Sequence, residues 1–421
     1  MKIKPSKDNA TTLCSTMGCR TYNGYDINWY DSWKNALLEV ANTGKLSHTV
    51  LSSPRQKDGR GNISPVTILI FTLAMEIKVN QGLKISDDTI FAEILVDMHK
   101  LLTNENLMDE LHEFSHTRDM SKTYSLNIQN AYNNVLNRLT DENERIELFF
   151  NLLEKKIEEA KDMLDERFKW QCSQSYKAAK FMYDNNTMYG YIPEEGIESA
   201  LKHGTTVIGH LGVAETLNIL IGQDQTTEKG LALAERIEKT FNTKCKEFKL
   251  KYKRNYGNYL TPAENLCYTS LKKFQSKYGK LTNISDKEFI TNSTHVPVWD
   301  KIDPFEKINI ESKLAKYSNA GCITYVELDA SAQNNQEALE KLVLYAMEKD
   351  VPYFAINVPS DSCEECGYQG DIGNVCPECG STKIQRLRRI TGYLTGDFRS
   401  AFNKGKQDEV EHRIHHNGCE I

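Results

Sequence analysis

The sequence has no long hydrophobic run, no internal repeat, no low-complexity tract and no Gly/Ser-rich linker. No apolar stretch reaches the roughly 18 to 20 residues that a membrane-spanning helix needs, so we expect no membrane span. The first residues, MKIKPSKD, lack the apolar core of a signal peptide. These absences predict a cytoplasmic protein without a membrane partner.

The chain also has no excess of basic residues. Its 52 Lys and Arg residues face 58 Asp and Glu residues, which gives a net charge of −6 and a sequence pI of about 6.0. Because nonspecific nucleic-acid binding depends on phosphate neutralisation by Lys and Arg, we expect no direct nucleic-acid partner. With 39% apolar residues, the 421-residue chain can bury a substantial core in two or three domains.

The eleven cysteines are an odd number, and four of them stand in two closely spaced pairs: Cys363, Cys366, Cys376 and Cys379. Zinc takes four thiolates in a tetrahedron, and each C-x-x-C turn can supply two of them. Gly367 and Gly380 follow the pairs and allow the backbone to curl round the ion. We predict a structural Zn²⁺ ribbon in a reducing compartment, with a disulfide pair or a redox C-x-x-C as the alternatives.

Hydrophobic periodicity predicts a mixed α/β fold. Residues 85–180 are expected to be helical, most clearly at 141–170, where apolar residues recur in steps of three and four. Phe149, Phe150 and Met163 are expected in the core. Strands are predicted at 205–208, 322–328 and 353–358, helices at 28–40, 225–255 and 335–349, a strand turning into a helix at 66–75, and a helix start with proline in its first position at 261–264. Such alternation is typical of α/β folds.

Two segments offer groups that could hold a nucleotide. The motif HGT at 203–205 leads into a predicted strand. After this strand, a glycine-lined turn precedes a helix that starts near residue 213, and the N–H groups at the start of this helix could bind a phosphate. Residues 291–298 are expected to form an ordered loop that enters a strand at 296–298. The small donors of this loop suit ribose or phosphate contacts, and a capped turn is the alternative.

The segment behind the cysteine pairs reads Arg389-Ile390-Thr391-Gly392-Tyr393-Leu394. Placed after a zinc ribbon, it resembles the radical loop of the anaerobic (class III) ribonucleotide reductases. Near the N-terminus, Met17-Gly18-Cys19-Arg20-Thr21 is similar to the finger loop of that family. Further family-like motifs follow in the family's order and extend the resemblance from about residue 15 to the end: 59–68, 203–205, 209–216, 261–264, 291–298 and 402–406, then Glu409, Glu411 and His415-His416.

The resemblance implies a radical reaction that reduces ribonucleoside triphosphates to 2′-deoxyribonucleoside triphosphates. Gly392 would store an unpaired electron, because a residue without Cβ lets its α-carbon flatten. Cys19 would become the thiyl radical that attacks the ribose, and Asn62 would lie near the reacting sugar. Substrate contacts are implied for six residues: His203, Gly204, Thr205, Asn292, Ser293 and His295. An activating enzyme that uses S-adenosylmethionine and an iron–sulfur cluster would form the glycyl radical, and formate or a thioredoxin-like thiol would be the reductant.

The family's fold is a barrel of ten strands, and its chain has several hundred residues before the radical cysteine, whereas this chain has 18. The resemblance therefore implies the second half of such a barrel with helical inserts at 1–358, a zinc ribbon at 359–385, and the radical loop and tail at 386–421. We expect the first half to be a separate polypeptide, and the assembled enzyme to be a homodimer.

Three alternatives stay open at this point. Another glycyl radical enzyme, such as a formate-lyase type, could share Gly392. The chain could instead be an inactive or regulatory zinc-ribbon fragment of the reductase. It could also be a spare part that repairs a cleaved radical loop in another chain, although such proteins are far shorter.

Overall fold

The computed structural model describes residues 21–23, 50–52, 62–102 and 120–416, apart from 186–187, 189, 264, 330, 333–334, 371, 391–392 and 396. The predicted helix at 28–40 and the two radical-bearing residues, Cys19 and Gly392, lie outside the described residues. The remaining predictions can be compared with the fold.

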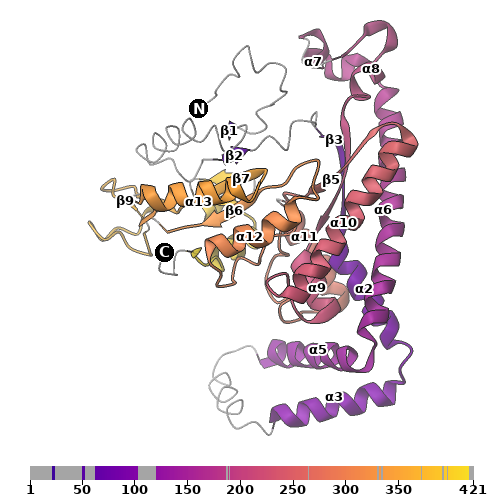
Figure 1. The fold of residues 1–421 in the computed structure, drawn as a ribbon. Helices are drawn as coiled ribbons and strands as arrows, with labels where there is room; N and C mark the ends of the chain where they lie inside the picture. The colour runs from indigo at the N-terminus through magenta and orange to yellow at the C-terminus, as the bar shows by residue number, and fades with distance from the viewer. Residues whose placement is uncertain are drawn as a thin grey trace.

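A three-stranded parallel sheet forms the centre of the larger part of the molecule. It contains β3 (Asn62–Leu69), β4 (Thr205–Leu211) and β5 (Asn255–Leu260), in that order. β3 continues directly into α2 (Ile70–Gly82), as predicted for residues 66–75. The long helices α6 (Glu142–Cys172) and α10 (Glu228–Tyr252) run side by side along one face of the sheet (Figure 1).

The hydrophobic core lies between this sheet and its helices. Helix α6 confirms the prediction for 141–170: Asp141 caps its N-terminus, and its apolar residues at the predicted spacing are buried. Phe149 and Phe150 belong to the core, but Met163 is 53% exposed, so that prediction is wrong. Leu164 takes the inward position, and one residue earlier on an α-helix points about 100° away from it.

The outer edge of β3 is partly closed by α6. Arg167 donates to the carbonyl of Pro65 (2.8 Å), and Gln171 donates to the carbonyl of Ile63 (3.3 Å). Pro65 itself has no N–H to offer, which is typical of an edge strand. Among the described residues no further strand pairs with this edge. The half-barrel remains a prediction, since the described strands form separate sheets.

A second sheet has the order β1-β2-β7-β6. Its strands are β1 (Thr21–Asn23), β2 (Val50–Ser52), β6 (Thr324–Glu327) and β7 (Tyr353–Asn357). The parallel pairing of β6 with β7, joined by α13 (Gln336–Glu348), confirms the predicted strand–helix–strand unit. Helix α12 (Pro304–Ala315) packs beside β6.

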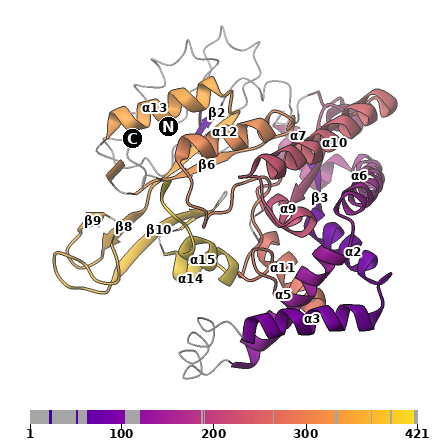
Figure 2. The same cartoon turned by 60° about the horizontal axis from the view of Figure 1, so that its bottom comes forward.

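The third sheet projects from the body together with the C-terminal helices (Figure 2). Its order is β11-β10-β8-β9. The strands are β8 (Ser360–Cys363), β9 (Gln369–Gly370), β10 (Ile384–Ile390) and β11 (Tyr393–Thr395), followed by α14 (Phe398–Ala401) and α15 (Lys404–Glu411). Within it, β8, β9 and the first part of β10 carry the cysteine turns, and the end of β10 pairs with β11.

Six further α-helices are described outside the elements named so far. They are α3 (Asp87–Leu102), α5 (Met120–Leu139), α7 (Lys180–Asp184), α8 (Glu198–Leu201), α9 (Val213–Ile221) and α11 (Leu266–Tyr278). Helices α3 and α5 form an antiparallel pair that extends away from the body at the bottom of Figure 1. None of the helices in the described parts is both long and apolar enough to cross a bilayer.

Two predicted elements are wrong for the same physical reason. Residues 261–263 are not helical, since α11 begins at Leu266, and residues 296–298 form no strand. In each case a side chain satisfies the backbone instead. The amide of Asn292 bonds both the N–H (2.7 Å) and the carbonyl (3.0 Å) of Ala263, and the Glu311 carboxylate accepts the N–H of Val296 (3.1 Å).

Candidate functional site

The four paired cysteines converge on one point of the third sheet. Their sulfur atoms all lie within 4.8 Å of one another, which suits one tetrahedral Zn²⁺ ion. The turns are equivalent: the Gly367 N–H donates to the Cys363 carbonyl, and the Gly380 N–H to the Cys376 carbonyl, both at 3.0 Å. Both glycines have positive φ. Backbone N–H donors, first that of Cys366, lower the pKa of the Cys363 thiol to about 6, which favours the thiolate that a metal requires.

The strand that leaves the cysteine cluster becomes one arm of a hairpin. β10 pairs with β11 so that Arg388 lies opposite Thr395, Arg389 opposite Leu394 and Ile390 opposite Tyr393. Only Thr391 and Gly392 stand between the last two partners in the sequence. The predicted radical glycine lies outside the described residues, but in the sequence it stands between the paired residues Ile390 and Tyr393.

Asp361 ties the hairpin to the ribbon. This carboxylate is buried on β8, and Arg388 of β10 binds it with both terminal nitrogens. The second oxygen also accepts the N–H of Ile372 at 3.1 Å. A bidentate Arg–carboxylate pair fixes direction as well as distance, so the cysteine cluster and the first half of the hairpin behave as one unit.

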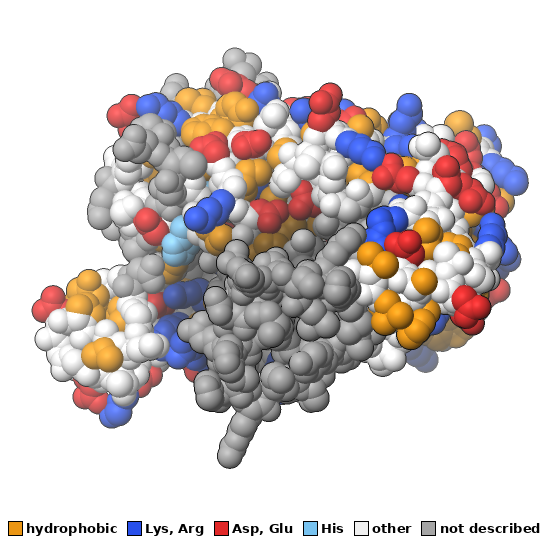
Figure 3. Space-filling model, turned by 90° about the horizontal axis from the view of Figure 1, so that it is seen from below, with side chains coloured by type: hydrophobic (Ala, Val, Ile, Leu, Met, Phe, Trp, Pro, Cys, Tyr) orange, Lys and Arg blue, Asp and Glu red, His pale blue; other side chains and the backbone are white. Residues whose placement is uncertain are grey.

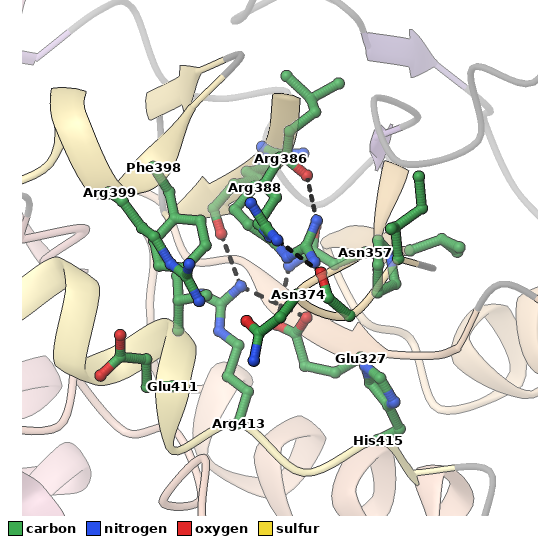
Figure 4. Close-up of a pocket in the computed structure, with 17 residues that line it drawn as sticks. Glu327, Asn357, Asn374, Arg386, Arg388, Phe398, Arg399, Glu411, Arg413 and His415 are labelled. Atoms are coloured by element: carbon green, nitrogen blue, oxygen red, sulfur yellow. Dashed lines mark hydrogen bonds and ion pairs between the residues drawn. The ribbon is translucent and has the colours of Figure 1, made fainter. Parts of the chain in front are cut away.

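Arg413, two residues after the end of α15, connects the hairpin to β6 of the second sheet. It donates to the carbonyl of Arg389 (2.7 Å) and pairs with Glu409 of α15 (3.1 Å). Its guanidinium also lies 3.5 Å from the carboxylate of Glu327 on β6. Figure 4 shows Arg413 reaching between Glu327 and the strand that carries Arg388.

These groups line a cavity of about 270 Å³ between the ribbon, the hairpin and the tail. Basic side chains gather where the ribbon meets the body (Figure 3). The arginines that line the cavity bond inside the protein: Arg386 donates to the carbonyl of Gly373, Arg388 binds Asp361, and Arg413 binds two carboxylates. The arginines therefore hold the protein together more than they create a free anion site.

The loop at 291–298 is ordered by a buried charge cluster. Glu311 of α12 accepts the N–H of Val296, pairs with His295 Nδ1 (3.1 Å) and binds Lys307 one helical turn away. Burial would raise the pKa of Glu311, but the charges of Lys307 and His295 outweigh it and lower the pKa to about 2. His295 is therefore held on a carboxylate that stays ionised.

His295 also connects this loop to the hairpin anchor. Its ring packs edge-on against Tyr325 of β6, with centroids 5.4 Å apart, and the Arg389 guanidinium lies 5.4 Å from the same tyrosine ring. A small cavity lies between the loop at 291–298, β6 and the C-terminal tail. Its lining includes His295, Tyr325, Glu409, Arg413 and His416. Three predicted substrate residues, Asn292, Ser293 and His295, thus share a loop that reaches the base of the hairpin.

The C-terminal tail closes this small cavity. The N–H of Glu327 donates to His416 Nδ1 (3.0 Å), and the N–H of Ile414 donates to the carbonyl of Val298 (2.9 Å). Burial, then the charge of Lys307, lowers the pKa of His416 to about 3, so its ring is the neutral acceptor that the bond to Glu327 requires.

The other predicted residues lie at the opposite end of β4. Asn62 pairs with Thr205 at the start of β3 and β4, next to His203 and Gly204. A Cβ on Gly204 would meet Ile63 Cγ2 at 2.3 Å, so glycine is required there for close strand packing. The loop at 291–298 instead meets the far end of β4, about 20 Å away for a strand of this length. The residues predicted to lie near the substrate therefore form two separate groups in the structure. Asn62 lies with His203, Gly204 and Thr205, and Asn292 lies with Ser293 and His295.

The turn at the start of α9 is occupied by the protein. The N–H of Val213 donates to the Ser293 carbonyl (3.2 Å), and Glu215 in the first helical turn accepts the N–H of Thr291 (2.7 Å). Burial raises the pKa of Glu215 to about 7, against the opposing effect of the Thr291 bonds. The predicted phosphate contact of this turn would have to compete with the loop at 291–293 for the first N–H group.

Sequence reasoning did not identify the residues that position the site. Tyr325 and Glu327 have no motif spacing. The contacts of Glu311 with Val296 and of Arg413 with Glu327 join residues that do not share a helix. A signal for Arg413 was present in retrospect: Glu409 stands one helical turn before it, which predicts an ion pair on one helix face. No comparable signal links it to Glu327 or to Arg389.

Comparison with known proteins covers almost the whole chain. The profile of the anaerobic ribonucleoside-triphosphate reductase family matches residues 2–416. The anaerobic ribonucleoside-triphosphate reductase of Haemophilus influenzae is 31% identical over an alignment of 322 residues that covers 72% of this chain and 44% of that protein. The enzyme of the same name from Enterobacteria phage T4 is 36% identical over 234 residues, covering 53% of this chain and 37% of that protein. The chain thus spans less than half the length of these relatives.

Solved structures share the fold. A structure of an anaerobic ribonucleotide reductase superposes with a TM-score of 0.58 at 18% identity, over 95% of this chain and 55% of that chain. The anaerobic ribonucleotide reductase of Thermotoga maritima in complex with dATP and CTP gives a TM-score of 0.57 at 18% identity, over 94% of this chain and 56% of that chain.

Proposed function

The chain belongs to the anaerobic ribonucleoside-triphosphate reductase family, and we propose that it provides the radical-bearing part of such an enzyme. It would reduce ribonucleoside triphosphates to 2′-deoxyribonucleoside triphosphates together with a separate polypeptide. The regions that the matched relatives share with this chain make up less than half of their own length.

Zinc is the metal that the four-cysteine cluster suits. Cys363, Cys366, Cys376 and Cys379 would hold the ion. Because four thiolates leave no open coordination position, its role would be structural. It would stiffen the turns from which β10 leaves, and Asp361 with Arg388 would pass that rigidity to the hairpin.

The radical steps would use two residues outside the described part of the chain. An activating enzyme of the S-adenosylmethionine and iron–sulfur type would remove one α-hydrogen from Gly392. The Cys19 S–H would then give its hydrogen atom to Gly392, which leaves a thiyl radical on the sulfur. That sulfur would take the 3′-hydrogen of the bound ribose. For these transfers the reacting atoms must approach to about 3–3.5 Å.

The reduction would then proceed on the sugar. The 2′-hydroxyl would leave as water with one proton, and the reductant would supply two electrons and the proton that becomes the new hydrogen at C2′. Formate would be oxidised to CO₂, or a thioredoxin-like dithiol would be oxidised to a disulfide. Cys19 would finally return the hydrogen to C3′. Asn62 could hydrogen-bond a ribose hydroxyl without titrating, and His203, Gly204, Thr205, Asn292, Ser293 and His295 are proposed to contact the substrate.

The hairpin register is the observation that carries this proposal. It leaves Thr391 and Gly392 as the connection between paired strands, directly behind a metal-type cysteine cluster. A glycine in such a connection can be presented to a sulfur atom, and the anchor at Arg413 would hold it there. The nearby loop at 291–298, ordered by Glu311, is suited to hold a substrate close to it.

The test is anaerobic turnover of the assembled enzyme. The chain, co-purified with its upstream partner and treated with the activating enzyme, is expected to convert a labelled ribonucleoside triphosphate into its 2′-deoxy product. Gly392→Ala and Cys19→Ser should abolish product formation, whereas Cys14→Ser should retain it. In air, the activated chain should be cut at Gly392, as seen by mass spectrometry. Intact chain after air exposure of an activated sample would contradict the proposal.

A second candidate is an inactive or regulatory fragment of the reductase. The four-cysteine cluster favours it, because a closed four-thiolate site stabilises a fold and takes no part in radical chemistry. A chain that binds Zn²⁺ and a reductase partner but never forms a radical would establish this alternative.

A further inference from the structure

We propose that Arg413 is a positioning residue for the Gly392 hairpin, which it fixes by bonding the end of β10 to β6. This inference rests on the proposed function, because it assigns a role in presenting Gly392 to the reaction. It adds a residue that the family-like motifs of the sequence do not contain.

The geometry places Arg413 at a junction of three elements. It donates 2.7 Å to the carbonyl of Arg389, the second-last residue of β10, and its other contacts go to Glu327 on β6 and Glu409 on α15. Arg389 stands three residues before Gly392 in the sequence. Because the acceptor is a backbone carbonyl, the bond holds the path of the strand itself and not one side chain.

The environment of Arg413 makes the contact rigid. Its side chain and those of Glu327 and Glu409 are each only 11–12% exposed, so water competes little for the guanidinium. Burial alone would lower the pKa of Arg413, but the two carboxylates outweigh it and raise the pKa, so the cation persists. A planar guanidinium with two carboxylates and one carbonyl has its donor directions fixed.

The position of the anchor favours a role in presentation over a purely structural one. Asp361 with Arg388 already holds the earlier part of β10 to the ribbon. Arg413 acts one residue further along, where the strand ends and the connection to β11 begins. A hydrogen transfer is sensitive to displacement of the reacting atom, and a shift of about 1 Å can cost about 10²-fold in rate.

The experiment compares Arg413→Lys with Arg399→Ala in the assembled, activated enzyme. Lysine keeps the charge but lacks the planar fork, so it cannot serve both carboxylates and the carbonyl together. Arg399 lines the same cavity, yet its side chain is exposed and contacts the ring of Phe398, which makes it the matched control. Two quantities are measured: the glycyl radical per chain by electron paramagnetic resonance, and the turnover per radical.

We expect Arg413→Lys to form the radical to within about twofold of the wild type, and to lose about 10²-fold in turnover per radical. Arg399→Ala should match the wild type in both quantities. Backbone amides of 386–390 and 393–395 should exchange hydrogen faster in Arg413→Lys and unchanged in Arg399→Ala. If the radical per chain and the total turnover fell by the same factor, the turnover per radical would be unchanged. That result would indicate general destabilisation and would overturn the inference.

Wild-type turnover per radical in Arg413→Lys would also overturn it. If this variant does not fold, the double variant Arg413→Gln with Glu327→Gln replaces it, because it removes one cation and one anion together and leaves the cluster's formal charge unchanged. The same split between radical yield and turnover is then expected. If the wild-type enzyme itself forms no radical, the proposed function fails and the inference with it, whereas a normal wild type beside an unaffected variant rejects the inference alone.

Discussion

Lys78 is a buried cation without a carboxylate among its described contacts. Its amine donates to Asn133 Oδ1 at 2.5 Å, and the side chain is fully buried between α2 and its neighbours. Burial, then the nearby charge of Arg145, lowers the pKa of Lys78 from 10.5 to about 7. The folded protein therefore binds this proton more weakly than the unfolded chain does.

The sign of the pH dependence follows from that difference. Between pH 7 and 10.5 the unfolded state binds more protons at this site, so the free energy of unfolding should rise with pH, by up to about 1.4 kcal/mol per unit. Lys78→Met should remove this slope and be more stable than the wild type at pH 7. Urea unfolding across this range measures it, with the exposed Lys84→Met as the control. Parallel pH profiles of wild type and Lys78→Met would contradict the assignment.

Glu311 is the opposite case, a buried anion with several partners. Glu311→Gln should destabilise the protein by about 3–5 kcal/mol at neutral pH, because Lys307 would be left as an uncompensated buried charge. Since the folded-state pKa is lowered to about 2 from 4.5, the stabilisation is present above pH 4.5 and is lost as the pH falls toward 2. The gap between variant and wild type should narrow over that window.

Thermal or urea unfolding at several pH values measures the gap, and Glu306→Gln on the same helix, an exposed position, is the control. A pH-independent gap would indicate that the loss comes from packing alone and not from the ionised carboxylate.

The cysteine ribbon is an element that we expect to depend on its metal. Its small hydrophobic cluster contains Cys363, Ile372, Cys376 and Ile384, with Tyr368 against it. So small a core provides little burial energy, and structural zinc sites supply folding free energy directly. Cys366→Ser should therefore lose tight Zn²⁺ binding and unfold the ribbon, while the core between β3–β5 and α10 stays folded.

Metal analysis of the purified chain should give one zinc per wild-type chain. Hydrogen exchange should rise in 360–385 of Cys366→Ser and remain unchanged in α10, with Cys172→Ser, a cysteine away from the cluster, as the control. Full zinc occupancy in Cys366→Ser would exclude a four-thiolate site.

Elements with a strong hydrophobic period could be predicted from the sequence. Helix α6, the β3–α2 junction and the β6–α13–β7 unit follow directly from such periods. The segments at 261–264 and 296–298 could not, because their backbone is held by Asn292 and Glu311 from elsewhere in the chain. Local propensity contains no information on bonds of that kind.

The candidate site likewise contains residues that the sequence predicts and residues that it does not. The cysteine cluster and the loop at 291–298 were recognisable by spacing or by resemblance. Arg413 was not, since a basic residue in the tail sequence HRIHH is typical of a solvated surface, and only the fold brings it to Glu327 and the Arg389 carbonyl. Positioning residues of this type depend on tertiary contacts, which a single sequence does not reveal.

At the scale of the whole molecule, the proposed split enzyme predicts a second polypeptide that binds this chain. Open sheet edges are a liability that proteins usually cover, and the outer edge of β3 pairs with no further strand among the described residues. The carbonyls of Ile63 and Pro65 are already bonded by α6, so the partner should not extend β3 along that stretch. Native mass spectrometry of the complex from its source should show a second polypeptide, and recovery of the 421-residue chain alone would argue against a split enzyme.

The central claim is an unpaired electron on Gly392, and electron paramagnetic resonance of the anaerobically activated complex tests it most directly. One α-hydrogen remains on a glycyl radical, so the account predicts a doublet that collapses toward a single line when the chain contains glycine deuterated at Cα. The signal should vanish in Gly392→Ala and persist in Gly373→Ala, where a Cβ meets open space. A doublet that survives in Gly392→Ala, or no signal from an active complex, would contradict the account.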